Sequence, residues 1–198
     1  KRIWFPKTPS LTKERFAGWF FPQFSLRSLR LCVIFFFLST AAFSQVPAPK
    51  DVLGFTPGDD RKLASWSQTV GYFKKLAETS DRVQFHEIGK STMGRPFVYV
   101  VISSPENIKN LEKYKKINDK LADPRKIEGG NPTGREDVTK RDAAAKNLVA
   151  EGKSIVLKTF GVHSTEVGSY LSSMLIAHEL ASSNEPRVKK ILDETITL

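Results

Sequence analysis

The hydrophobic period of this chain changes between Ser154 and Ser169, which predicts a strand, a turn and a helix in that order. Before the change, a short apolar run rich in β-branched side chains is typical of a strand buried on both faces. It comprises Ile155, Val156, Leu157, Phe160 and Val162. After it, apolar side chains recur on one helix face. These are Val167, Tyr170, Leu171, Met174, Leu175 and His178.

His163 and Glu166 stand between the predicted strand and helix, at the sheet edge where open α/β folds usually bind ligands. An imidazole and a carboxylate at this spacing can reach one small ion, and zinc accepts both ligand types. Catalytic zinc commonly takes three protein ligands and leaves a fourth position for water. We therefore predict one zinc ion, with His163 and Glu166 as the two ligands that this sequence makes visible.

Two segments of the chain resemble a known family. The first, Phe160–Gly168, has the order apolar strand, Gly, apolar residue, His-x-x-Glu. It is similar to the first zinc-ligand segment of the zinc metallocarboxypeptidases of the carboxypeptidase A type. The second, Ile88–Pro96 followed by the strand Phe97–Ser103, resembles the upstream hairpin of that family. The two segments lie in the family's order, and the resemblance runs from about Phe55 to Leu198.

The resemblance implies a zinc-dependent hydrolase that removes amino acids from the carboxyl end of peptides. In that family zinc polarises the scissile carbonyl and a water molecule, and a Glu acts as general base. By the same resemblance the third ligand (a His), the substrate-carboxylate Arg, a Tyr and the Glu base are expected beyond Leu198, so no catalytic residue is assigned within this chain. Thr165 stands where several members carry a substrate-binding Arg. We expect the reading frame to continue, and these residues alone to be inactive.

The formal net charge of +10 is concentrated at the start of the chain. Residues 1–30 hold seven basic side chains and one acidic side chain, whereas residues 45–198 hold 24 basic and 20 acidic ones. No basic run interleaved with aromatic residues occurs in the later part, which argues against nucleic-acid binding.

Residues 27–44 have the pattern of a signal peptide: a positive segment, an apolar run from Leu31 and an exit of small residues ending at Ser44. The run of about 13 residues is shorter than the ~20 needed to span a bilayer. We expect cleavage near Gln45 and a secreted or periplasmic protein, the alternative being an uncleaved anchor. Cys32 would be lost on cleavage, which leaves no disulfide. Residues 1–25 are interpreted as translated sequence upstream of the true start.

The predicted class is α/β, with a mixed, mostly parallel sheet, helices on both faces and an incomplete carboxyl end. The predicted domains are 1–44 (upstream residues and signal peptide), 45–58 (linker) and 59–198 (amino-terminal part of a carboxypeptidase-like domain). Strands are expected at 83–88, 97–103, 155–162 and from 195. Helices are expected after an aspartate cap in the turn 56–60, and at 105–121, 136–151, 167–178 and 186–194.

Other sites are excluded by spacing. Gly89-Lys90-Ser91 lacks the earlier glycine of a phosphate-binding loop. His86 and His178 each precede a Glu but lack the second His of a His-Glu-x-x-His helix. His178 also lies roughly 18 Å along a helix from Glu166, too far to share an ion.

Two other functions remain open. One is deacylation of acyl-amino acids by the related zinc fold, whose members are typically intracellular. The other is a binding module that keeps the fold without metal. The expected partner is a peptide or protein substrate, with no nucleic acid and no stable membrane partner after processing.

Overall fold

The computed structural model of the chain describes residues 45–128 and 134–198. The predicted signal peptide, Cys32 and the residues upstream lie outside this described part. The helices are α2 (Pro49–Leu53), α3 (Trp66–Thr79), α4 (Pro105–Lys109), α5 (Leu111–Ala122), the 3-10 helix η1 (Pro124–Lys126), α6 (Arg135–Glu151), α7 (Val167–Ser182) and α8 (Pro186–Glu194). The strands are β1 (Val83–Lys90), β2 (Pro96–Ile102), β3 (Ser154–Val156) and β4 (Thr195–Thr197).

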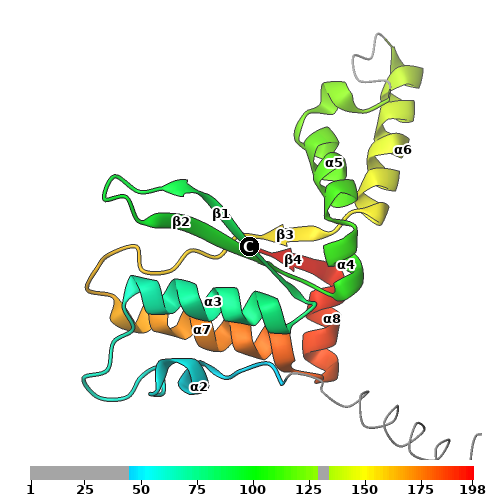
Figure 1. Cartoon of the computed structure of the whole chain (residues 1–198). Coiled ribbons are helices and arrows are strands. Elements are labelled where there is room, and N and C mark those ends of the chain that lie inside the picture. The colour runs from blue at the N-terminus through cyan, green and yellow to red at the C-terminus, as the bar shows by residue number, and fades with distance from the viewer. Residues whose placement is uncertain (1–44, 129–133) are drawn as a thin grey trace, which may run out of the picture. The chain divides into compact units, whose positions relative to one another are not determined.

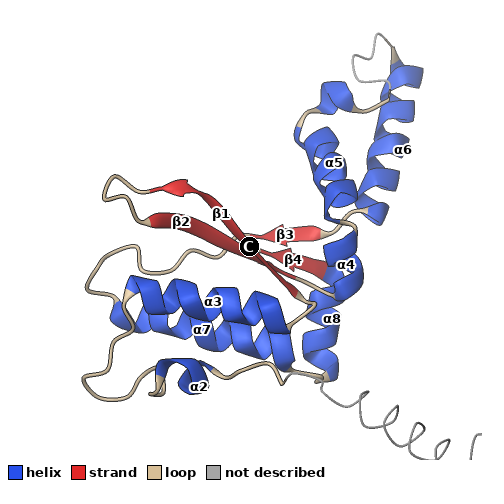
Figure 2. Cartoon of the chain, viewed as in Figure 1, coloured by secondary structure: helices blue, strands red, loops and turns tan. Residues whose placement is uncertain are grey.

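The described strands form one sheet in the order β1-β2-β4-β3 (Figure 2). Val83 of β1 pairs with Ile102 of β2, and Ile102 pairs with Thr197 of β4, both in antiparallel fashion. Strands β3 and β4 are parallel, with Ser154 opposite Thr195. The α/β class is confirmed, whereas the expectation of a mostly parallel sheet is wrong for these strands. The short turn after β1 is one cause, because a tight turn joins only antiparallel neighbours.

Helices cover both faces of the sheet, as predicted. Neighbouring residues of a strand point to opposite faces, and both Val101 and Ile102 of β2 are buried. Ile102 belongs to an apolar cluster with residues of α3 and α7, whereas Val101 packs in a second cluster with Tyr114 and Ile117 of α5. Helices α3 and α7 lie side by side on their face of the sheet (Figure 1). The element that follows the predicted site, α7, is therefore fixed to the larger core.

The cap of α3 differs from the prediction. Asp59 accepts the backbone N–H of Thr56, so it stabilises the preceding turn and does not cap the helix. The cap is Ser65, whose hydroxyl accepts the N–H of Gln68 while the Gln68 side chain accepts the N–H of Ser65. This reciprocal pair satisfies two backbone donors at once, which a single aspartate does not.

The helix predicted at 105–121 is divided in two. Asn110 has φ −106° and ψ 15°, which ends α4 at Lys109 and lets α5 begin at Leu111. The charged helix predicted at 136–151 is confirmed as α6, and it has no buried residue. Within residues 45–128 and 134–198, no helix combines the length and apolar character that crossing a membrane requires.

The buried face of α7 is rotated from the predicted one. Leu171 and Met174 are buried as expected, but Leu175 is exposed, and Ala177 and Ala181 are buried in its place. Small side chains allow helices to approach closely, since the distance between packed helices depends on the side chains at their contact. The alanines therefore suit the side of α7 that belongs to the core.

Strand β3 is exposed over its whole length, so the prediction of a strand buried on both faces is wrong for the described residues. Ile155 and Val156 are exposed, and Leu157 just after the strand is 70% exposed. Strand β4 pairs with one edge of β3, and no other described strand pairs with β3. An apolar run indicates what a strand could bury, whereas its actual burial depends on neighbours that are distant in sequence.

Candidate metal centre

The β3–α7 loop (residues 157–166) carries both predicted ligands. At its start it continues the sheet, because the Lys158 N–H donates to the Leu198 carbonyl and the Leu198 N–H donates to the Val156 carbonyl, both at 2.8 Å. At its end it forms a tight turn in which the Glu166 N–H donates to the His163 carbonyl at 3.1 Å. The two ligands therefore lie on a turn between a strand of the sheet and a long helix.

The side chains of His163 and Glu166 contact each other directly. His163 Nδ1 lies 2.6 Å from Glu166 Oε1, and the two side chains are 73% and 46% exposed. Glu166 is the N-cap residue of α7, where the positive end of the helix dipole favours a carboxylate. The structure thus brings together, at one exposed point, the two residues that sequence spacing selected.

This pair fits two of the positions around a zinc ion. A tetrahedral ion with bonds of ~2.0–2.2 Å to nitrogen and oxygen holds two donor atoms roughly 3.3 Å apart. Since Nδ1 and Oε1 are 2.6 Å apart, widening the pair by less than ~1 Å would admit the ion. In the described residues no group of three or more His, Cys, Asp and Glu side chains could hold a metal. Metal binding by His163 and Glu166 therefore stays a prediction, because the described residues bring only two donor atoms together.

In the first turn of α7, Ser169 holds the loop and Tyr170 holds the helix to the segment before α3, and neither residue was predicted as part of the site. The Ser169 hydroxyl accepts the Gly161 N–H at 3.0 Å, and the Tyr170 hydroxyl donates to the Ala64 carbonyl at 3.2 Å. Gly161 has a φ of 67°, in the left-handed region that favours glycine. The only sequence signal for this arrangement is a glycine before the ligands and a hydroxyl residue in the first helical turn.

The remaining histidines take no part in the pair. His178 is partly buried, three turns further along α7. His86 lies in β1 and stacks on Tyr99 of β2 with the ring centroids 4.8 Å apart. Thr165, at the position where several members of the resembled family carry an Arg, is exposed.

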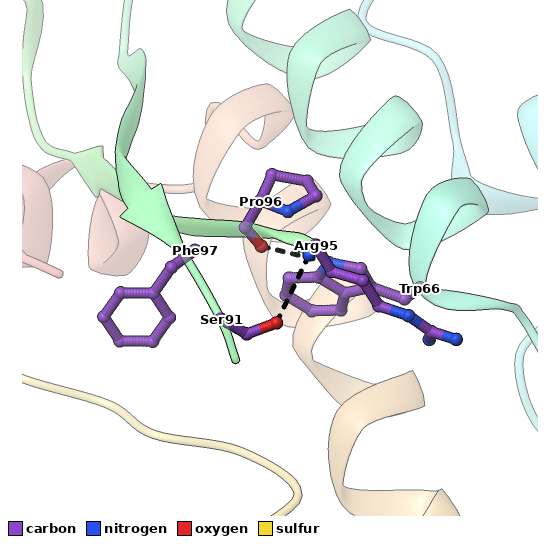
Figure 3. A pocket seen from close by; sticks show the side chains of 5 residues that line it. All are labelled: Trp66, Ser91, Arg95, Pro96 and Phe97. Carbon is purple, nitrogen blue, oxygen red and sulfur yellow. Dashed lines mark hydrogen bonds between the residues drawn. The ribbon is translucent and has the colours of Figure 1, made fainter. Parts of the chain in front are cut away.

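A separate hollow of about 330 Å³ lies at the turn between β1 and β2, next to the start of α3 (Figure 3). It is lined by Trp66, Ser91, Arg95, Pro96 and Phe97. The Trp66 indole N–H donates to the Pro96 carbonyl at 3.1 Å and thereby joins α3 to the hairpin. Neither predicted ligand lines this hollow, so the candidate centre is the exposed pair itself.

A comparison with models of known protein families identifies the family to which this chain is related. The family model described as zinc carboxypeptidase matches residues 69–198, which is more than half of the chain and includes both the hairpin and the β3–α7 loop. No curated protein and no solved structure gives a significant match. The matched region contains the His163–Glu166 pair at the N-terminus of α7. The chain belongs to the zinc carboxypeptidase family.

Proposed function

We propose that the complete protein is a zinc-dependent metallocarboxypeptidase that hydrolyses C-terminal amino acids from peptides. The observation that carries this proposal is the contact between His163 Nδ1 and Glu166 Oε1, 2.6 Å apart, inside the region matched by the family. A nitrogen and an oxygen donor from one turn are the ligand types that zinc accepts.

The residues of this chain would have the following roles. At 2.6 Å the Nδ1–H of His163 donates to Glu166 Oε1, and release of that proton would leave Nδ1 and the carboxylate as two metal donors on one side of the loop. Bound zinc would supply a Lewis acid at the scissile carbonyl. The family resemblance assigns a third ligand and a general base to residues after Leu198. We therefore propose that residues 45–198 alone hold zinc weakly and hydrolyse no peptide.

We also propose that the protein is exported. The basic segment, the apolar run and the small residues ending at Ser44 support cleavage near Gln45 and a secreted or periplasmic location. N-terminal sequencing of exported material tests this. A sequence that starts at or near Gln45 is expected, whereas recovery of the Arg27–Phe43 segment would replace export with membrane anchoring.

A second candidate is a binding module that keeps the fold without catalysis. It is favoured by one observation, namely that the described residues bring only two donors together. Metal content separates the two candidates, because a binding module of this kind would hold no stoichiometric zinc.

The test uses the complete protein, with metal analysis and release of C-terminal amino acids from peptides with free or amidated carboxyl ends. His163→Ala and Glu166→Ala should each abolish zinc content and hydrolysis, whereas His178→Ala should keep both. Wild-type protein without zinc and without hydrolysis would contradict the proposal. So would an unchanged zinc content in both ligand variants.

A further inference from the structure

Ser169 contacts both sides of the turn that carries the metal pair. Its hydroxyl accepts the Gly161 N–H at 3.0 Å, and its own N–H donates to the Glu166 carbonyl at 3.1 Å. The Glu166 N–H in turn donates to the His163 carbonyl at 3.1 Å. These three hydrogen bonds link Gly161 to Ser169, Ser169 to Glu166 and Glu166 to His163. The backbone between Gly161 and His163 closes the ring.

Little else in the described residues holds this part of the loop. The side chain of His163 is 73% exposed, and all residues from Val162 to Glu166 are exposed. An exposed loop loses conformational entropy when it is fixed in one geometry, and apolar packing cannot offset that loss here. A hydrogen bond that restricts the loop next to His163 would therefore also restrict the position of the imidazole.

Neighbouring hydroxyls of α7 make a different type of contact. Ser172 Oγ donates to the Ser169 carbonyl at 2.7 Å, and Ser173 Oγ donates to the Tyr170 carbonyl at 2.6 Å. Both contacts stay within α7. Ser172 is partly buried, as Ser169 is, so it provides a matched control.

Gly161 provides the backbone conformation that this contact needs. Its φ of 67° lies in the left-handed region that favours glycine, whereas a Cβ placed on it would lie 3.5 Å from Tyr170 Cβ, in ordinary contact. Tyr170 is itself attached to the segment before α3 through the Ala64 carbonyl. The first turn of α7 is thus held in place, and the loop is hydrogen-bonded to it.

We propose that Ser169 is a positioning residue for the metal pair, and that its hydroxyl holds His163 against Glu166 before zinc binds. This role rests on the proposed function, since it assumes that His163 and Glu166 bind zinc. Partners that orient metal ligands without touching the metal commonly change metal affinity by 10–100-fold when they are removed.

The test compares Ser169→Ala, Ser169→Thr and Ser172→Ala in the complete protein. Two quantities are measured: the zinc dissociation constant, by competition with a chelator, and the hydrogen-exchange rate of the Gly161 amide in zinc-free protein. Ser169→Ala should weaken zinc binding by about tenfold and speed exchange at Gly161. Ser169→Thr keeps a hydroxyl and should restore both, and Ser172→Ala should change neither.

The outcomes separate the two proposals. If His163→Ala abolishes zinc binding while Ser169→Ala binds zinc as wild type does, the positioning role is wrong and the proposed function stands. If wild-type protein binds no zinc through His163, both fail. Should Ser169→Ala not fold, Ser169→Val has the shape of Ser169→Thr but no hydroxyl to accept the Gly161 N–H. The same losses are expected of it, and wild-type zinc affinity in this variant would overturn the positioning role.

Discussion

Replacing Asn107 with Ala should destabilise the protein, because this side chain joins α4 to the end of α8. Asn107 is 2% exposed. Its amide nitrogen lies 3.0 Å from Ser103 Oγ, 2.9 Å from the Leu192 carbonyl and 3.1 Å from the Asp193 carbonyl. The group has two hydrogens, so these three contacts amount to about two net hydrogen bonds. The contact fixes α8, and hence the start of β4, beside the end of β2.

The size of the loss depends on what remains after substitution. The Leu192 carbonyl keeps the N–H of Ser104, and the Asp193 carbonyl keeps Lys153 Nζ. Neither oxygen is left without a partner, so the larger penalty for an unsatisfied buried group does not apply. Two net hydrogen bonds at about 1 kcal/mol each give a loss of about 2 kcal/mol in the free energy of unfolding.

Urea unfolding followed by circular dichroism measures this loss as a lower midpoint with an unchanged slope. Asn118→Ala is the control, because among the residues that the structure describes its amide donates only to the Tyr114 carbonyl within α5, and Ala is the better helix former. The control should stay within ~0.5 kcal/mol of wild type. A loss below ~0.5 kcal/mol for Asn107→Ala, or equal losses for both variants, would refute the reasoning.

Two further predictions concern the free energy of unfolding. Burial, reinforced by the Asp51 carboxylate, raises the pKa of Tyr72 well above its usual range. Unfolded tyrosine ionises near pH ~10. The contribution of Tyr72 to the free energy of unfolding should therefore be complete below that pH and decrease above it. Tyr72→Phe should flatten this alkaline decline, and an identical pH profile would contradict the burial argument. Gly161→Ala should lower the free energy of unfolding by about 1–2 kcal/mol, because its φ is left-handed. Gly71→Ala, inside α3 with open space around it, should raise that free energy by about 0.5–1 kcal/mol. Equal effects of the two variants in chemical unfolding would exclude a backbone cause.

Elements with local signals were predictable from the sequence. The strands around Gly94 and Pro96 form the expected hairpin because the turn residues and the apolar runs lie close together in the chain. The contact between His163 and Glu166 follows from a spacing of one turn. In both cases the interacting residues are near neighbours, so the sequence pattern carries the geometry.

Features that depend on distant residues were not predictable in this way. The direction of β4 relative to β2 is set by the path of the chain through α8, which no short pattern records. The role of Ser169 requires the left-handed turn at Gly161 to bring an amide back toward the helix. The cap of α3 is an intermediate case, because the Ser65 and Gln68 pair was visible in the sequence and only the competing aspartates obscured it.

The exposed strand β3 also affects how these residues would behave at high concentration. A strand with an open edge offers a row of backbone donors and acceptors to any second strand, and natural proteins usually protect such edges with charge or proline. Ile155, Val156 and Leu157 carry neither, and their apolar side chains are accessible. The strand is only three residues long, and a short strand limits such pairing. The accessible apolar side chains, more than the backbone edge, would therefore lower the solubility of residues 45–198.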